Sequence, residues 1–126
     1  MEMKSETIKM DEFSKLCIKI GTFFSNCDGS FDKSEREFLE YYVLHLDENL
    51  KPTFDPKLYI EEEIKKHLSI EDVIGATNDF LADFDENGRT AIRGTLAVLI
   101  DKIIKVDGEI HPNETKYFEM WKKQVI

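Results

Sequence analysis

The amino-acid sequence predicts an all-α fold, a compact single-domain bundle of about six to seven helices that spans residues 1–126. Hydrophobic residues recur at intervals of three and four along most of the chain, which is the spacing that gives a helix one apolar face. Several of these segments begin with a helix-start signal. The signal is either a capping residue directly before Pro, or a capping residue with an acid three positions later. No segment alternates hydrophobic and polar residues between hairpin turns, so strands are not expected.

The first two helices are predicted over 10–27 and 33–46. Asp28-Gly29 separates them, because Gly readily takes the positive φ that closes a helix.

Cys17 and Cys27 lie ten residues apart on the first helix, which is too far along its axis for a disulfide. We therefore expect two free thiols, and redox or thiolate-metal chemistry has little support.

Two connecting helices are predicted over 55–86. The first begins at Asp55-Pro56, since Asp caps the orphan N–H groups of a helix start and Pro fits its first position. Ser69 opens the second, and Asp72 three residues later completes a capping box. Asn87-Gly88 is expected to end this helix. The acidic and basic residues at 61–66 are interpreted as a solvated helix face.

The last two helices flank a second Asp-Gly pair, Asp107-Gly108. A hydrophobic stripe over 92–103 predicts the first of them, and His111-Pro112 opens the second. Glycines also fall inside predicted helices, where each costs about 1 kcal/mol relative to Ala. Close crossing of helices is the structural explanation that we expect for them. These glycines are Gly21, Gly75 and Gly94.

The sequence contains an internal repeat of one helix-turn-helix unit, over approximately 10–47 and 89–125. Asp28 and Asp107 lie 79 residues apart, and the same offset aligns Gly, an apolar residue and Glu in both turns. The flanking hydrophobic stripes align as well. Because both copies have the same turn pattern between matching hydrophobic stripes, they indicate one supersecondary unit that occurs twice in the chain.

Both turns carry potential metal ligands at positions one, three, five and eight, and all of them are oxygen donors except the His at position five of the second turn. Calcium and magnesium prefer such ligands, and the His in the second turn would also admit zinc. The candidate metal ligands are Asp28, Ser30, Asp32 and Glu35 in the first turn, and Asp107, Glu109, His111 and Glu114 in the second.

A structural alternative explains part of this pattern. Glu35 and Glu114 fall three residues after Asp32 and His111, where a carboxylate can bond back to the capping residue. Capping does not account for the two leading aspartates, because each follows the negative end of a helix dipole, where an anion is disfavoured. A positive group is expected to face each of them. It could be the N–H groups at the start of the following helix, a lysine such as Lys33 or Lys105, or a cation.

A third acidic corner resembles the opening of an EF-hand loop, with Asp83, Asp85 and Asn87 at positions one, three and five and Gly88 at position six. Position twelve is Gly94 instead of the bidentate Glu that calcium loops use. A calcium site here is an alternative to a simple helix end.

The repeated element, acid-Gly-x-apolar-x-x-x-Glu, resembles the signature of the TerB-like tellurite-resistance family. The matching acids are Asp28 and Glu35 in one copy and Asp107 and Glu114 in the other. The resemblance implies a compact helical fold without known catalytic activity, a role in bacterial tellurite resistance and stress response, divalent metal binding, and scaffolding near the inner face of the membrane. The region from Asp47 to Leu68 has no counterpart in this pattern.

Charge and composition limit the partners. The formal net charge of −9 argues against nucleic acid, which is bound through clustered Lys and Arg, and favours cations or basic protein surfaces. The polar N-terminus and short apolar runs predict a cytoplasmic protein without membrane insertion, which could reach the membrane through partners. His45 and His67 stand alone, so no catalytic site or enzyme activity is predicted.

We therefore expect a non-enzymatic TerB-like protein that binds divalent cations at its acidic turns and acts as a scaffold or adaptor for other proteins. The alternative is an acidic interaction module without metal, such as an immunity protein or a phage or secretion accessory.

Overall fold

The computed structural model describes residues 6–27, 33–46, 51–106 and 111–126. These residues form an all-α bundle, and none of them lies in a strand. The six helices are α1 (Glu6–Asn26), α2 (Lys33–Leu44), α3 (Pro56–Lys66), α4 (Ile70–Leu81), α5 (Glu86–Lys105) and α6 (Pro112–Gln124).

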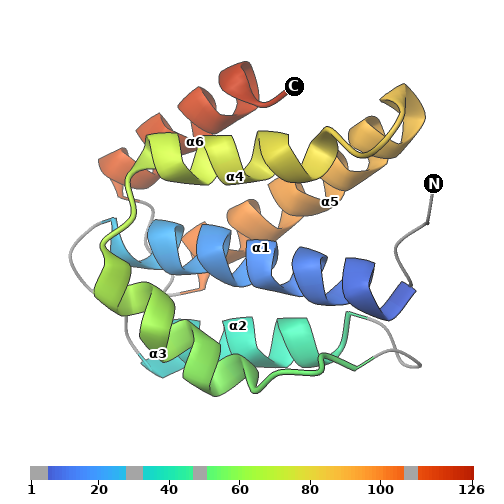
Figure 1. Ribbon diagram of the computed structural model, residues 1–126. Coiled ribbons are helices and arrows are strands. Elements are labelled where there is room, and N and C mark those ends of the chain that lie inside the picture. Colours follow the sequence, from blue (N-terminus) through green and yellow to red (C-terminus); the bar gives the residue numbers. More distant parts are fainter. Residues whose placement is uncertain (1–5, 28–32, 47–50, 107–110) are drawn as a thin grey trace.

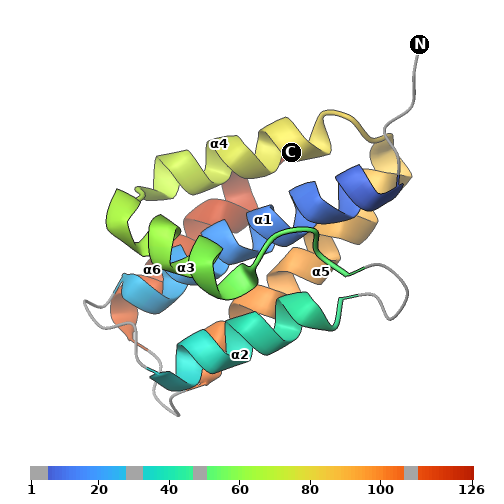
Figure 2. The ribbon, with the colours of Figure 1, turned by 60° about the horizontal axis from the view of Figure 1, so that its bottom comes forward.

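Helix α1 is the central element of the bundle (Figures 1 and 2). It packs against α2, α3, α4 and α5, while α6 packs against α4 and α5. The sequence explains this position, because α1 is apolar around much of its circumference: Cys17, Ile18, Ile20 and Phe24 are all fully buried. A helix that is apolar all round belongs in the interior of a bundle.

The predicted caps of α3 and α4 are confirmed. The backbone N–H of Lys57 donates to Oδ1 of Asp55 at 3.0 Å. In the capping box of α4, the N–H of Asp72 donates to Oγ of Ser69 at 3.1 Å, and the N–H of Ser69 donates to Oδ2 of Asp72 at 3.0 Å. Helix α3 ends at Lys66, and the next residue, His67, takes the left-handed conformation with φ 50° and ψ 57°.

The predicted boundary between the fourth and fifth helices is wrong. Helix α4 ends at Leu81, and Asn87-Gly88 lies in the first turn of α5 instead of ending α4. The reason is that Asp85 caps α5: its Oδ1 accepts from the N–H of Gly88 at 2.8 Å, and its carbonyl accepts from Arg89 at 2.8 Å. A capping Asp therefore outweighed the turn preference of Asn-Gly.

Close helix crossing is confirmed for Gly21 only. A Cβ at this position would lie 2.6 Å from Cδ1 of Leu39 in α2 and 3.0 Å from Cδ1 of Ile103 in α5. A Cβ at Gly75 or Gly94 would meet no atom within 4 Å, since both positions are exposed. The crossing explanation is wrong for these two glycines.

The hydrophobic core joins the two halves of the chain. Trp121 of α6 is 2% exposed, and its Nε1 donates to Oγ1 of Thr77 in α4 at 3.3 Å. Ring contacts between Phe23 and Tyr117 and between Phe24 and Phe118 connect the end of α1 to α6. Within the described ranges, no helix combines the length and the apolar character that crossing a bilayer requires.

Candidate functional site

The four helix ends that flank the two predicted metal-binding turns lie at one end of the bundle. Helices α1 and α5 end there, and α2 and α6 begin there, at the left of Figure 1. The side-chain amide of Asn113 in α6 donates to the carbonyl of Cys27, which follows α1, at 3.5 Å. The repeat therefore brings its two copies together instead of placing them at opposite ends, and we call this region the corner end.

Of the eight predicted ligands, three lie within the described residues: Glu35, His111 and Glu114. The remaining five, Asp28, Ser30, Asp32, Asp107 and Glu109, lie outside the described residues. Among the residues that are described, no three His, Cys, Asp or Glu side chains converge as a metal site.

Glu114 is the third residue of α6 and is 2% exposed. Its Oε1 accepts from the backbone N–H of His111 at 3.0 Å, which is the bond that the capping-box interpretation predicts for this glutamate. His111 has the extended conformation of a capping residue, with φ −90° and ψ 145°, and Pro112 takes the first helical position. The capping-box explanation of Glu114 is thus confirmed.

Glu35 occupies the equivalent place in the first copy. It is the third residue of α2 and is 4% exposed. The residue that would be capped by it, Asp32, lies outside the described residues. The repeat therefore holds two buried carboxylates, one from each copy, at the start of the helix that follows each turn.

Capping alone does not require this burial. Asp72 makes the same bond at the start of α4 while it is exposed, and its hydrogen bonds with Ser69 hold the pKa of its carboxyl below the usual value. Removing a carboxylate from water costs several kcal/mol unless hydrogen bonds or a positive charge compensate it. The corner end thus keeps two acids out of water where an exposed acid would cap equally well.

A third buried carboxylate lies beside the corner end and was missed by the sequence interpretation. Glu63 of α3 is 1% exposed, whereas residues 61–66 were expected to be solvated. Both oxygens of Glu63 lie 3.4 Å from Nζ of Lys19 in α1, and Oε1 also accepts from Nζ of Lys66 at 2.9 Å. A signal was present, because Glu63 falls three residues after the buried Ile60 on the apolar face of α3.

Glu63 borders a pocket of about 60 Å³ between the ends of α1 and α3. Thr22 lines the same pocket, and its buried Oγ1 has no hydrogen-bond partner among the described residues. The volume suffices for a few water molecules, which would satisfy this hydroxyl. The pocket is too small for a typical organic substrate.

The third acidic corner is a helix-capping turn at the opposite end of α5. Asp83 and Asp85 are exposed, and Asn87 already lies in α5. Residues 86–94, which would form positions four to twelve of an EF-hand loop, are helical throughout. Oδ1 of Asp85 is occupied by the N–H of Gly88, so this corner differs in conformation from a calcium loop.

The isolated polar residues have structural roles. The His45 ring stacks on Tyr41 with centroids 4.1 Å apart, and its Nδ1 lies 2.9 Å from the Tyr41 carbonyl. Both cysteines are free thiols, as expected, and burial raises the pKa of the Cys17 thiol far above its ordinary range. Cys17 is therefore protonated and unreactive at neutral pH.

Comparison of the chain with protein-family models, with curated proteins and with solved structures found no match.

Proposed function

We propose that this protein is a non-enzymatic, TerB-like helical adaptor that binds a divalent cation at the corner end and acts through other proteins. The observation that supports the cation is the burial of Glu35 and Glu114, at 4% and 2% exposure, at one end of the bundle. Each glutamate belongs to one copy of the repeated turn, and each turn supplies further acids in sequence.

A cation explains both the repeat and the burial. Glu35 and Glu114 lie at the same end of the bundle, and in sequence each turn adds a leading aspartate. Like charges at short range repel one another. Each leading aspartate also follows a helix C-terminus, where the dipole disfavours an anion. A divalent ion would offset both effects, whereas capping serves only the carboxylate at the third helical position.

The donor chemistry favours calcium or magnesium. Asp, Glu and Ser oxygens are hard ligands, which these two ions prefer. His111 would allow zinc to compete in the second turn, because imidazole is a good zinc ligand. The TerB-like resemblance supports the same type of ion, and it also supports a role in a bacterial stress response of the tellurite-resistance type in the cytoplasm.

Titration calorimetry with calcium, magnesium, manganese and zinc tests the cation. We expect binding to the native chain and its loss in the double variant Asp28→Asn plus Asp107→Asn. The matched control is Asp83→Asn plus Asp85→Asn at the opposite corner, which changes the net charge equally and retains an N-cap, since Asn caps as well as Asp. If the native chain binds no ion at millimolar concentration, or the control loses binding equally, the cation proposal is wrong.

The second candidate function is a metal-free acidic interaction module, such as an immunity protein or a phage or secretion accessory. It is favoured by the acid-rich segment 69–88, which has six acidic residues and no Lys or Arg. All six are exposed. Binding of a protein partner that persists unchanged in excess chelator, by a chain that binds no cation, would favour this alternative.

A further inference from the structure

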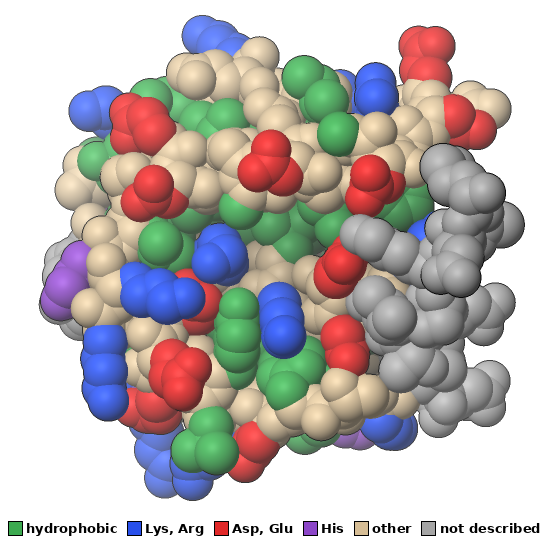
Figure 3. Space-filling model, viewed as in Figure 1, with side chains coloured by type: hydrophobic (Ala, Val, Ile, Leu, Met, Phe, Trp, Pro, Cys, Tyr) green, Lys and Arg blue, Asp and Glu red, His purple; other side chains and the backbone are tan. Residues whose placement is uncertain are grey.

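The Asn87-Gly88 pair at the start of α5 has the chemistry of a self-modifying site. Asn87 is the one asparagine in the sequence that is followed by glycine. The backbone nitrogen after an asparagine can attack the side-chain amide carbon, and glycine hinders this attack least because it has no Cβ. Asn87 is exposed, and the α4–α5 corner, residues 82–85, lies at the upper right of Figure 3, where acidic side chains project into solvent.

The reaction is a deamidation that needs no cofactor and only water as a second reactant. The backbone nitrogen of Gly88 loses its proton and forms a bond to Cγ of Asn87. The bond from Cγ to the amide nitrogen breaks, ammonia leaves with a proton from solvent, and a five-membered succinimide results. Water then opens this ring at either carbonyl. One product has aspartate at position 87, and the other has isoaspartate, in which the backbone runs through the side chain.

The fold hinders this reaction at the attacking nitrogen. The N–H of Gly88 donates to Oδ1 of Asp85 at 2.8 Å, so a carboxylate holds the proton that must leave. The negative charge of Asp85 also disfavours an anion on that nitrogen. Asn87 is the second residue of α5, and ring closure requires its ψ to leave the helical range. Attack therefore requires that the first turn of α5 opens.

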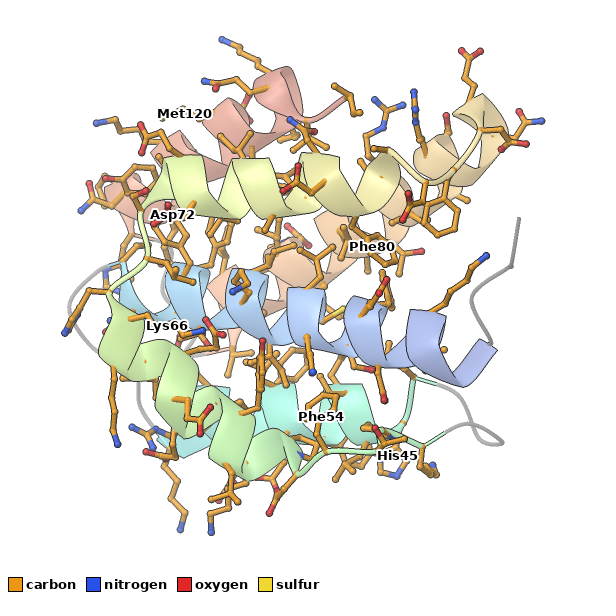
Figure 4. All side chains as sticks on the ribbon, viewed as in Figure 1. His45, Phe54, Lys66, Asp72, Phe80 and Met120 are labelled. Carbon is orange, nitrogen blue, oxygen red and sulfur yellow. The ribbon has the colours of Figure 1, made fainter. Side chains whose placement is uncertain are left out.

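Contacts on both sides of the cap hold this turn closed. The ring of Phe84 lies 5.2 Å from that of Phe80, and Nζ of Lys9 lies 5.7 Å from the Phe84 centroid. Figure 4 shows Phe80 between α4 and α1. After the cap, Nε of Arg89 donates to the carbonyl of Leu81 at 3.0 Å. The start of α5 is therefore tied to the end of α4, and opening of the turn disturbs this connection.

Asn78 provides an internal comparison. Its Nδ2 donates to the carbonyl of Gln124 at 3.2 Å, and its Oδ1 accepts from the N–H of Ile126 at 2.8 Å. The residue that follows it is Asp79, whose side chain hinders attack. Trypsin cleaves after Lys and Arg, so a single peptide, residues 67–89, contains both asparagines. The two rates can therefore be measured in the same peptide.

We propose that Asn87-Gly88 is a latent deamidation site that the N-cap of α5 protects in the folded protein. Deamidated chains accumulate with the time that the first turn of α5 spends open. Aspartate at position 87 leaves the helix intact, because the helix dipole favours an acid in the first turn. Isoaspartate adds a methylene to the backbone, which moves the N–H of Gly88 away from Asp85 and keeps the turn open. The inference does not depend on the cation.

The test follows deamidation of the full chain by peptide mass spectrometry at constant pH and temperature, in buffer and in guanidinium chloride. In denaturant, Asn87 should convert at least about tenfold faster than Asn78, because glycine leaves the attacking nitrogen unhindered. In the folded chain, Asn87 should convert about tenfold or more slowly than in denaturant, since only locally opened molecules react. Hydrogen exchange of the Gly88 amide reports the same opening and should show similar protection.

Variants of the cap locate the protection. In the folded chain, Asp85→Ala should convert about fivefold faster than Asp85→Asn, since Asn caps as well as Asp and Ala does not. Both variants lack the same charge, so the difference between them isolates the hydrogen bond. In denaturant the two variants should convert equally, and Asn87→Gln should remove the signal at position 87. Melting curves verify each fold. If Asp85→Ala does not fold, the ratio of rates in buffer and denaturant and the Gly88 exchange still decide.

Four results would overturn the proposal. They are no conversion at Asn87 in denaturant, faster conversion at Asn78, equal rates at Asn87 in buffer and denaturant, and equal rates in the two folded Asp85 variants. The purified isoaspartate product should have lost exchange protection at Gly88, whereas Asn87→Asp should retain it. Protection in both would contradict the opposite effects of the two products. All measurements are made in excess chelator, so failure of the cation proposal leaves them unaffected.

Discussion

Three buried glutamates differ in what compensates each carboxylate. The charge of Glu63 is offset by two lysines, whose side chains are 23% and 52% exposed. One oxygen of Glu114 accepts from the backbone N–H of His111. Glu35 is buried at the equivalent point of the other repeat copy. At the residue scale, therefore, the ion pairs of Glu63 are structural, whereas the two repeat glutamates each follow an acid-rich turn in the sequence.

Replacing Glu63 by Gln tests its structural role. The change keeps the shape of the side chain but leaves Lys19 without its carboxylate, so we expect the free energy of unfolding to fall by about 1 to 2 kcal/mol. Glu62→Gln is the matched control on the exposed face of α3, where changes are usually within about 0.5 kcal/mol. Urea unfolding followed by circular dichroism measures both. Equal effects of the two changes would mean that burial at Glu63 has no energetic consequence.

Glu63 also affects a neighbouring tyrosine. Desolvation, followed by the negative charge of Glu63, raises the pKa of Tyr59 to about 12, while the unfolded value is about 10. Because the folded state holds this proton more tightly, Tyr59 contributes stability that is complete below pH 10 and is lost between about pH 10 and 12. In an alkaline titration of phenolate absorbance, Tyr59→Phe should remove part of the late step. Glu63→Gln should move that part to lower pH, and an unchanged late step in both variants would contradict this assignment.

At the scale of single helices, glycine has opposite effects at different positions. Gly21→Ala would place a Cβ 2.6 Å from Leu39 at the crossing of α1 and α2, so we expect destabilisation of about 1 to 3 kcal/mol. Gly75→Ala and Gly94→Ala meet no neighbouring atom and should each stabilise the protein by about 0.5 to 1 kcal/mol, through helix propensity alone. Thermal melts of the three variants measure the signs. A stabilised Gly21→Ala protein would show that the crossing relaxes without cost.

The features that could be predicted from the sequence are those that depend on residues close together in the chain. The caps at Asp55 and Ser69 depend on residues within three positions, and both were placed correctly. The end of α4 was misplaced because two local signals, Asn-Gly and the capping Asp85, competed over four residues. The burial of Glu63 was missed because it depends on Lys19, which is distant in sequence.

At the scale of the whole molecule, the candidate site depends on helices from both copies of the repeat. The corner end is formed by the ends of α1 and α5 and the starts of α2 and α6 (Figure 1). Helix α1 ends there and packs against α2, α3, α4 and α5, so it connects the corner end to the rest of the bundle.

Cation binding should consequently stabilise the entire bundle. An ion that binds only the folded chain adds RT ln(1 + [ion]/Kd), which is about 1.4 kcal/mol at ten times Kd. For a domain of this size that corresponds to an increase in Tm of about 5 °C relative to the same protein in chelator. The double variant Asp28→Asn plus Asp107→Asn should show no shift between the two conditions, and Asp83→Asn plus Asp85→Asn should keep it. An equal increase in Tm in the native chain and in both double variants would contradict a specific site. It would mean that the ion only screens the general negative charge of the protein, because a specific site would lose its ion when Asp28 and Asp107 are replaced.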